Sequence, residues 1–281
     1  MVNSHGHFVW YELKTTDVQA AKAFYVKVMG WRARDVSLPG AAFALCSAGE
    51  GGPVSGLMTL PESATAKGAA PHWVGYVGVN DIDAATDLVK RLDGAVYVPP
   101  TEIADTSRFS VFADPQTAML GMLESIGPER MQPADMNAPG RVGWHELLAT
   151  DAEKALGFYA ELFDWQKAEA DIGPMGTYQR LSAGGQTIGG ILAKPPAMPA
   201  PYWLYYFNVA DVDAAAKRVT AAGGQILDGP FQSPGGAWIV HCADPQGAVF
   251  ALAGGRRNVV GYFERVSPRD PSDPRSRRWS W

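Results

Sequence analysis

Two glutamates occupy matching positions in two similar stretches of the sequence. Glu12 lies in the stretch WYELKTTD, and Glu146 lies in WHELLATD. Side chains alternate between the two faces of a strand, so each glutamate shares a face with the tryptophan two residues before it, Trp10 or Trp144. A carboxylate beside an indole in an apolar pocket has a raised pKa and could accept a proton or bind a cationic or hydrogen-bonding ligand. A salt bridge or a hydrogen bond to the sheet would explain both glutamates equally well.

These stretches belong to a repeat that covers most of the chain. Asp17 and Asp151 are 134 positions apart, as are the tryptophans that close the two predicted helices. A later block, APHWVGYVGV, returns as APYWLYYFNV after 130 positions. Loops absorb changes of length easily, so the loss of four residues between the blocks fits a duplicated domain.

A weaker repeat lies within each half. Asp17 and Asp81 each precede apolar residues spaced i, i+3, i+4, i+7, which predicts two amphipathic helices. Strand candidates, FVWYEL and WVGYVGV, come before them, and Gly30 and Gly94 are placed to stop them. Short β-rich pieces follow each helix. Each half therefore reads as strand, helix and three strands, twice over.

The repeat sets the predicted boundaries. The domains are expected at 1–127 and 141–255, with a linker at 128–140 and a basic tail at 256–281. The linker region contains three prolines, and the tail holds seven arginines against three acidic residues. We expect the tail to be extended and mobile, or to dock on a partner subunit.

Composition narrows the classes of partner. A net charge of −5 and a pI near 5.5 give no field that would gather nucleic acid or anionic lipid. The two cysteines fall one in each half, which argues against a disulfide scaffold and fits a reducing cytoplasm. The sequence shows no secretory signal and no long apolar run. We therefore expect a cytoplasmic protein with a small-molecule ligand and no nucleic-acid or membrane partner, and leave a homodimer open.

The pattern resembles a known superfamily. Paired βαβββ units, an acidic helix cap before an AAxxFY-like stripe, and an Asp-Pro turn before the last strand are similar to the vicinal oxygen chelate superfamily. That group includes glyoxalase I, bleomycin-resistance proteins, fosfomycin-resistance enzymes and extradiol dioxygenases. The resemblance extends to about Gly254 and implies an α+β fold of tandem domains, each built of two βαβββ units forming a curved sheet around a cavity. Because one scaffold hosts several chemistries in this group, activity does not follow from the fold.

The resemblance also implies a divalent metal held by His, Glu or Gln side chains. The positions that it assigns to ligands hold Trp10, Gly56, Val74 and Gly121 in the first half, and Trp144, Gly189 or Gly190, Leu204 and Ala251 in the second. None of these side chains can bind a metal. We therefore predict no metal and no other cofactor, and no metal-dependent glyoxalase or dioxygenase mechanism.

Histidines and aromatic residues complete the candidate site. His241, three residues before Asp244, could add a titratable group opposite Glu146, although a lone histidine is more often structural. His145 is expected to be a satisfied core residue. The side chains predicted to bind ligand are Trp10, Trp144, His72, Tyr76, Tyr202 and Tyr206.

The sequence therefore predicts a glyoxalase/bleomycin-resistance-like protein that binds a small organic molecule in aromatic cavities without the metal. The alternative is an isomerase, lyase or dioxygenase that uses Glu12 or Glu146 as a base, with or without an atypically bound divalent metal. Binding requires only a pocket, whereas catalysis also requires a base of suitable geometry and pKa. Whether any reaction is catalysed is left open.

Overall fold

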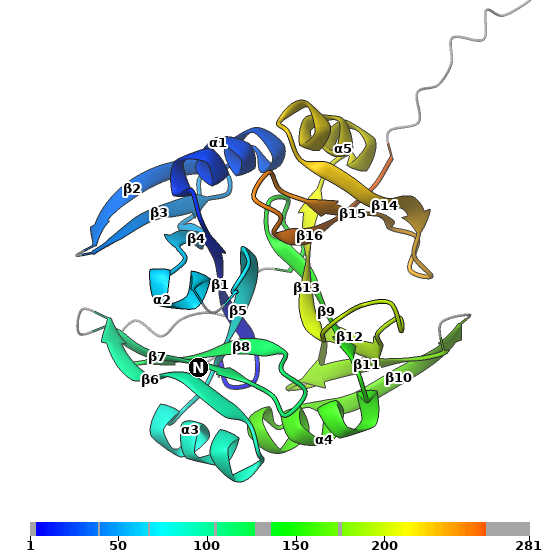
Figure 1. The fold of residues 1–281 in the computed structure, drawn as a ribbon. Coiled ribbons are helices and arrows are strands. Elements are labelled where there is room, and N and C mark those ends of the chain that lie inside the picture. The colour runs from blue at the N-terminus through cyan, green and yellow to red at the C-terminus, as the bar shows by residue number, and fades with distance from the viewer. Residues whose placement is uncertain are drawn as a thin grey trace, which may run out of the picture.

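The computed structural model describes residues 4–38, 40–66, 68–103, 106–126, 136–173 and 176–256. Within these residues each half of the chain forms one eight-stranded sheet, and the two sheets lie beside each other (Figure 1). Each half runs strand, helix and three strands, twice, with a short extra helix between the units of the first half. The prediction of an α+β fold with tandem domains of two βαβββ units is confirmed.

The elements of the first domain are β1 (Phe8–Thr15), α1 (Val18–Met29), β2 (Arg32–Leu38), β3 (Ala41–Ser47), β4 (Pro53–Thr59), α2 (Glu62–Thr65), β5 (His72–Gly78), α3 (Ile82–Arg91), β6 (Ala95–Ile103), β7 (Ser107–Ala113) and β8 (Met119–Ser125). Those of the second are β9 (Val142–Ala149), α4 (Ala152–Phe163), β10 (Gln166–Gly173), β11 (Gly176–Ala183), β12 (Gln186–Ala193), β13 (Tyr202–Val209), α5 (Val212–Ala221), β14 (Gln225–Gln232), β15 (Trp238–Ala243) and β16 (Val249–Gly254).

The two sheets share one strand order. It is β2-β3-β4-β1-β5-β8-β7-β6 in the first domain and β10-β11-β12-β9-β13-β16-β15-β14 in the second. The first strands of the two units, β1 and β5 or β9 and β13, pair antiparallel at the centre. Each also pairs in parallel with the last strand of its own unit. The central strands carry both glutamates and most of the candidate aromatic residues.

The four long helices begin as the repeat predicts. The carboxylate of Asp17 accepts a hydrogen bond from the backbone N–H of Ala20 at 2.9 Å, and Asp81, Asp151 and Asp211 cap α3, α4 and α5 in the same way. A side-chain acceptor at this position satisfies a backbone donor that would otherwise lack a partner. The cap therefore fixes where each central strand ends and its helix begins.

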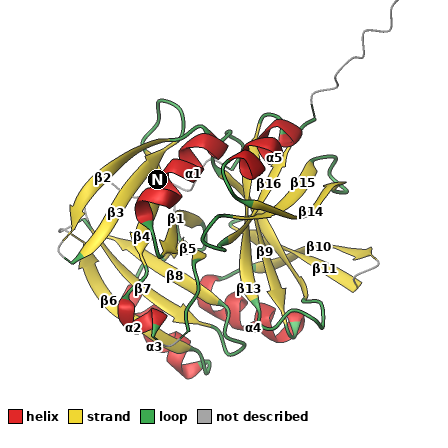
Figure 2. Ribbon diagram, turned by 45° about the horizontal axis from the view of Figure 1, so that its top comes forward, coloured by secondary structure: helices red, strands yellow, loops and turns green. Residues whose placement is uncertain are grey.

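The helix-covered faces of both sheets are buried in one apolar core that extends across the domain boundary. Helix α1 contacts α5 of the other domain, and α3 contacts α4, as the two views show (Figures 1 and 2). Trp73 on β5 and Trp203 on β13 belong to this core. The helical side of neither sheet is therefore open to solvent over its central strands.

Polar groups cross the same boundary in matched pairs. The hydroxyl of Tyr25 on α1 donates to Asp244 of the second domain at 3.1 Å, and that of Tyr159 on α4 donates to Asp114 of the first at 3.0 Å. Both carboxylates are buried and also accept backbone N–H bonds within their own turns. These contacts relate the halves by an approximate two-fold arrangement.

Side chains at equivalent positions of the first strands, β1 and β9, also meet across the boundary. The hydroxyl of Tyr11 lies 2.7 Å from Nε2 of His145, the residue 134 positions later. Nδ1 of His145 lies 2.5 Å from the carbonyl oxygen of Ile188, which can only accept, so Nε2 is the acceptor for Tyr11. His145 is fully buried and satisfied, as predicted, but its ring packs against Phe8 and Tyr11 of the first domain as well as Tyr205 of its own.

Parts of the predicted boundaries lie outside the described residues, namely 128–135 of the linker and 257–281 of the tail. The predicted boundaries remain predictions. Within the described residues no helix is long and apolar enough to cross a membrane.

The His145 environment predicts a pH-dependent stability. Burial lowers the pKa of His145 from 6.5 to about 3. The unfolded chain therefore gains a proton below pH 6.5 that the folded chain cannot take up, and this contribution to stability is lost as the pH falls from 6.5 towards 3. We expect a loss of up to about 3 kcal/mol by pH 4.

Urea unfolding of the wild type and of His145→Gln at pH 7 and pH 4 measures this contribution. Glutamine keeps a donor and an acceptor but cannot become charged in this range, so the wild type should lose more stability than the variant between the two pH values. Parallel losses in both proteins would contradict the assignment.

Candidate functional site

The face of each sheet opposite the helices carries a separate apolar cluster, and we call it the inner face. In the second domain the cluster is built on buried Leu148, Leu192 and Leu204, with Tyr206 and Ala251. Partly exposed side chains of Trp144, Tyr178 and Tyr202 pack against these residues. The inner face of the second sheet therefore presents aromatic groups that solvent can reach.

Glu146 lies in the middle of this inner face. It pairs with Gly190 on β12 and with Leu204 on β13, and its side chain is only partly exposed. The hydroxyl of Tyr206 donates to its Oε1 at 2.9 Å. Burial raises the pKa of Glu146, and hydrogen bonds from Tyr206 and Tyr178 oppose that rise. Among the described residues the carboxylate thus contacts rings and hydroxyls and forms no ion pair.

Tyr178 is held close to the glutamate by a glycine. The ring of Tyr178 lies over Gly190, where a Cβ would collide with it. The indole Nε1 of Trp144 donates to the Tyr178 hydroxyl at 2.7 Å, leaving that hydroxyl free to donate its own proton towards Glu146. Two neighbouring strands and one small residue therefore orient the phenol.

His241 adds a third polar group beside Glu146 and Tyr206. It lies on β15 opposite Ala251, and its Nε2 is 3.4 Å from the Tyr206 hydroxyl. Burial lowers the pKa of His241, against an opposing effect of Asp228 on the neighbouring strand. The imidazole is therefore neutral at pH 7, and Glu146, Tyr206 and His241 form one chain of polar groups across three strands.

The corresponding glutamate of the first domain is differently placed. Glu12 is buried and forms an ion pair with Lys14, two residues later on the same face of β1. The Lys14 amine also lies 3.2 Å from the sulfur of Met58. Nδ1 of His72 contacts the carbonyl oxygen of Ala70 at 2.7 Å. Glu12 therefore has a cationic partner within its own strand.

The strand registers show which residues replace this partner in the second domain. In the first sheet Lys14 lies between Met58 and His72 on the neighbouring strands. In the second sheet Leu148 takes the place of Lys14, and its neighbours are Leu192 and Tyr202. The remaining predicted ligand-binding residues, Trp10 and Tyr76, lie beside each other on the inner face of the first sheet. The geometry brings the predicted site residues onto two inner faces. The two glutamates differ in their surroundings, because Glu12 has a cationic partner and Glu146 lies among neutral rings and hydroxyls.

The positions that the family resemblance assigns to a metal do lie on adjacent strands. Trp10 pairs with Tyr76, which pairs with Gly121, and Gly56 pairs with Glu12. The side chains at the assigned positions, Trp10, Gly56, Val74 and Gly121, offer no donor atom for a metal. Within the described residues no three or more His, Cys, Asp or Glu side chains gather as a metal site. The residues present do not fit the family metal, and the metal content stays a prediction.

Sequence reasoning missed two residues of these sites. Lys14 shares the face of Glu12 because it is two positions further along β1, so alternation alone could have identified it. Tyr178 had a weaker signal, because its register depends on where β11 pairs with β12. The equivalent residue of the first domain is Phe43, whose ring lies over Gly56, the glycine that pairs with Glu12. That equivalence is the one signal that would have pointed to Tyr178.

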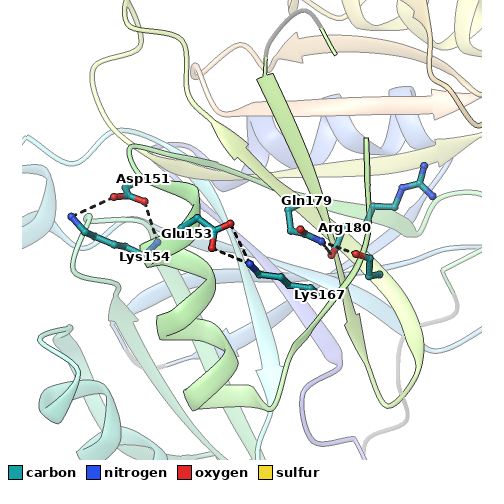
Figure 3. Close-up of polar contacts among 7 residues, drawn as sticks. Asp151, Glu153, Lys154, Lys167, Gln179 and Arg180 are labelled. Atoms are coloured by element: carbon teal, nitrogen blue, oxygen red, sulfur yellow. Dashed lines mark hydrogen bonds and ion pairs between the residues drawn. The ribbon is translucent and has the colours of Figure 1, made fainter. Parts of the chain in front are cut away.

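A surface groove on the helical side is a different feature. It is lined by Glu153, Leu156, Gly157, Ala160, Trp165 and Lys167. Glu153 and Lys167 pair with each other across it at 3.0 Å, near the Asp151 cap of α4 (Figure 3). Both charged side chains are largely exposed, so their pairing contributes little to stability. The groove contains no counterpart of the half-buried Glu146.

Comparison with known proteins places the chain in a family. The model described as Glyoxalase/Bleomycin resistance protein/Dioxygenase superfamily matches residues 6–120 and 141–252. The chain is 34% identical over 245 residues to "Putative glyoxylase CFP32" of Mycobacterium tuberculosis, covering 86% of this chain and 92% of that protein. It is 30% identical over 260 residues to "Anthracycline biosynthesis protein DauV" of Streptomyces sp. strain C5, covering 86% and 91%.

Solved structures share the fold at low identity. The Mn(II)-bound glyoxalase from Novosphingobium aromaticivorans superimposes with a TM-score of 0.62 at 17% identity, over 90% of this chain and 83% of that one. The 2,3-dioxygenase LapB from Pseudomonas sp. KL28 gives 0.62 at 13% identity, over 91% and 94%. Two family-model matches, one in each eight-stranded domain, show that the chain belongs to the Glyoxalase/Bleomycin resistance protein/Dioxygenase superfamily as a tandem two-domain member.

Proposed function

We propose that the protein binds a small organic molecule on the inner face of its second domain, with Glu146 as the polar contact and without the family metal. The observation that carries this proposal is a half-buried carboxylate that is surrounded by partly exposed aromatic rings and that has no cationic partner among the described residues. Rings of Trp144, Tyr178 and Tyr202 suit a flat or hydrophobic ligand. The first domain is the weaker candidate because Lys14 already neutralises Glu12.

The setting of Glu146 supports a functional role on energetic grounds. A carboxylate taken out of water without a counter-charge is unfavourable for the folded state. Two phenol hydrogen bonds offset only part of this cost, because the pKa of Glu146 remains raised. Binding sites commonly retain such unfavourable groups because the ligand supplies the missing interaction.

A second candidate function is favoured by the chain of polar groups from Glu146 through Tyr206 to His241. A carboxylate with a raised pKa is a better proton acceptor than an ordinary one. In an isomerase or lyase, Glu146 would take a proton from a carbon of the bound molecule, and the electron pair left behind would move to an adjacent group. The proton would then return to another carbon or to the leaving group. The Tyr206 hydroxyl and neutral His241 would hold the carboxylate in place.

Ligand binding is tested with a panel of naphthalenes that carry a hydroxyl, hydroxymethyl, aminomethyl or carboxylate group. We expect isothermal titration calorimetry to detect at least one ligand, with Glu146→Gln and Trp144→Phe each weakening it tenfold or more, about 1.4 kcal/mol. Glu12→Gln is the matched control and should change the affinity less than threefold. If no compound binds, or the first-domain variant has the larger effect, the site assignment fails.

The same samples examine the second candidate. Incorporation of deuterium from heavy water into a carbon of a bound compound, lost in Glu146→Gln, would establish proton abstraction. Binding without exchange would leave the protein a binder only.

The two glutamates should affect stability in opposite directions. The folded pKa of Glu146 lies above its ordinary value of 4.5, so stability from this group is lost as the pH rises above 4.5. Glu146→Gln should therefore increase the free energy of unfolding at pH 7. Glu12→Gln should decrease it, on the order of 1–3 kcal/mol, because the poorly exposed Lys14 amine loses its partner. Thermal and urea unfolding of both variants provide the measurement, and changes of the same sign would refute this account.

Elemental analysis should find no stoichiometric Zn, Ni, Fe or Mn in protein purified without a metal-affinity column. The positions of the expected ligands hold indole, glycine or alkyl groups, which cannot coordinate a cation. About one metal per chain, lost on chelation together with ligand binding, would overturn this part of the proposal.

A further inference from the structure

The two domains differ at one point that bears on the chemistry of the ligand. Both sheets place a glutamate at the same position of the inner face, beside a tryptophan and next to a glycine on the adjoining strand. In the first domain the lysine two residues later directs its amine onto the glutamate. In the second domain the equivalent residue is Leu148, whose side chain is buried and cannot provide a charge.

The aromatic side chains around the glutamate also differ between the two domains. His72, the neighbour of Lys14 on β5, is replaced by Tyr202 on β13, the neighbour of Leu148. Phe43, which lies over Gly56, is replaced by Tyr178 over Gly190. The second site thus has Leu148 and Tyr202 in place of the Lys14 amine and the His72 imidazole, and it has two additional phenols around the carboxylate. Electron-rich rings around a carboxylate form an arrangement that attracts organic cations through their π faces.

Nearby cations of the second domain have other partners. The Arg180 guanidinium, on the strand of Tyr178, lies 2.7 Å from Asp171 and 3.7 Å from Glu169. The amine of Lys194 donates to the carbonyl oxygen of Met198 at 2.6 Å. Within the part of the chain that the structure describes, neither forms an ion pair with Glu146.

We infer that the second domain binds a molecule with a protonated amine attached to a flat apolar body, and that this amine takes the place that the Lys14 ammonium occupies in the first domain. The inference rests on the proposed function and specifies the class of ligand for that site. The ammonium contacts Glu146 and the surrounding phenol and indole rings. The apolar body packs on the partly exposed aromatic side chains of the inner face.

Matched probes and matched variants test this inference in the full chain. The probes are 2-naphthylmethylamine, which is protonated at pH 7, and 2-naphthylmethanol, which has the same shape but no charge. Leu148→Lys introduces a tethered amine with the same spacing from Glu146 that Lys14 has from Glu12, and Leu148→Met is a neutral control of similar length. Circular dichroism and thermal unfolding establish that each variant is folded.

Calorimetry should show that the wild type binds the amine at least tenfold more tightly than the alcohol. Leu148→Met should retain the affinity for the amine within threefold, and Leu148→Lys should weaken it thirtyfold or more. Equal affinity for the two probes, or equal affinity of the two variants for the amine, would overturn the inference.

The outcomes also separate this inference from the proposed function. If the alcohol or a naphthalene carboxylate binds as well as the amine and Glu146→Gln still weakens binding, only the amine inference is wrong. If neither probe binds and no other naphthalene binds, both the inference and the proposed function are wrong. Should Leu148→Lys not fold, the comparison of amine with alcohol in the wild type and in Glu146→Gln decides the question.

Discussion

Burial of both helix-covered faces in one shared core is the constraint on which the rest of the structure depends. The buried hydrogen bond between Tyr11 and His145 joins side chains of the first strands of the two domains within this core. In the part of the chain that the structure describes, the helical face of each sheet is covered by its own helices and by the other domain, and the inner face of the central strands is not. The alternation of side chains along β1 and β9 then determines that Trp10, Glu12 and their counterparts point to that face.

Much of the fold could be predicted from the sequence because its signals are local and repeated. An aspartate cap followed by apolar residues at helical spacing identifies a helix, and the offset of Asp151 from Asp17 reveals the second domain without any knowledge of contacts. The shared core could not be predicted in this way. Nothing in the neighbourhood of Tyr25 indicates that its hydroxyl will meet Asp244, because that contact depends on how two finished domains pack.

For the candidate site, the sequence could predict which face of the sheet each side chain occupies, but not which charged or polar groups would surround it. Alternation placed Glu146 beside Trp144 correctly, yet the same argument applied equally to Glu12. Two differences in side chains separate them. Lys14 reaches Glu12 along its own strand, and the ring over the neighbouring glycine carries a hydroxyl in Tyr178 but not in Phe43. The repeat preserves the position of the carboxylate. Its charge environment depends on neighbouring side chains, and these differ between the two domains.

One further position makes the two halves unequal. Tyr205 and Gly75 are equivalent residues, and the Tyr205 ring fills the space beside Gly75, whose backbone N–H donates to its hydroxyl at 2.6 Å. A Cβ on Gly75 would lie 2.7 Å from that ring. A symmetric pair of second halves would bring two tyrosine rings into a space that holds one, and a pair of first halves would leave that space without a ring. At this position each half therefore has a shape that the other half complements, so two copies of one half could not form the same contact.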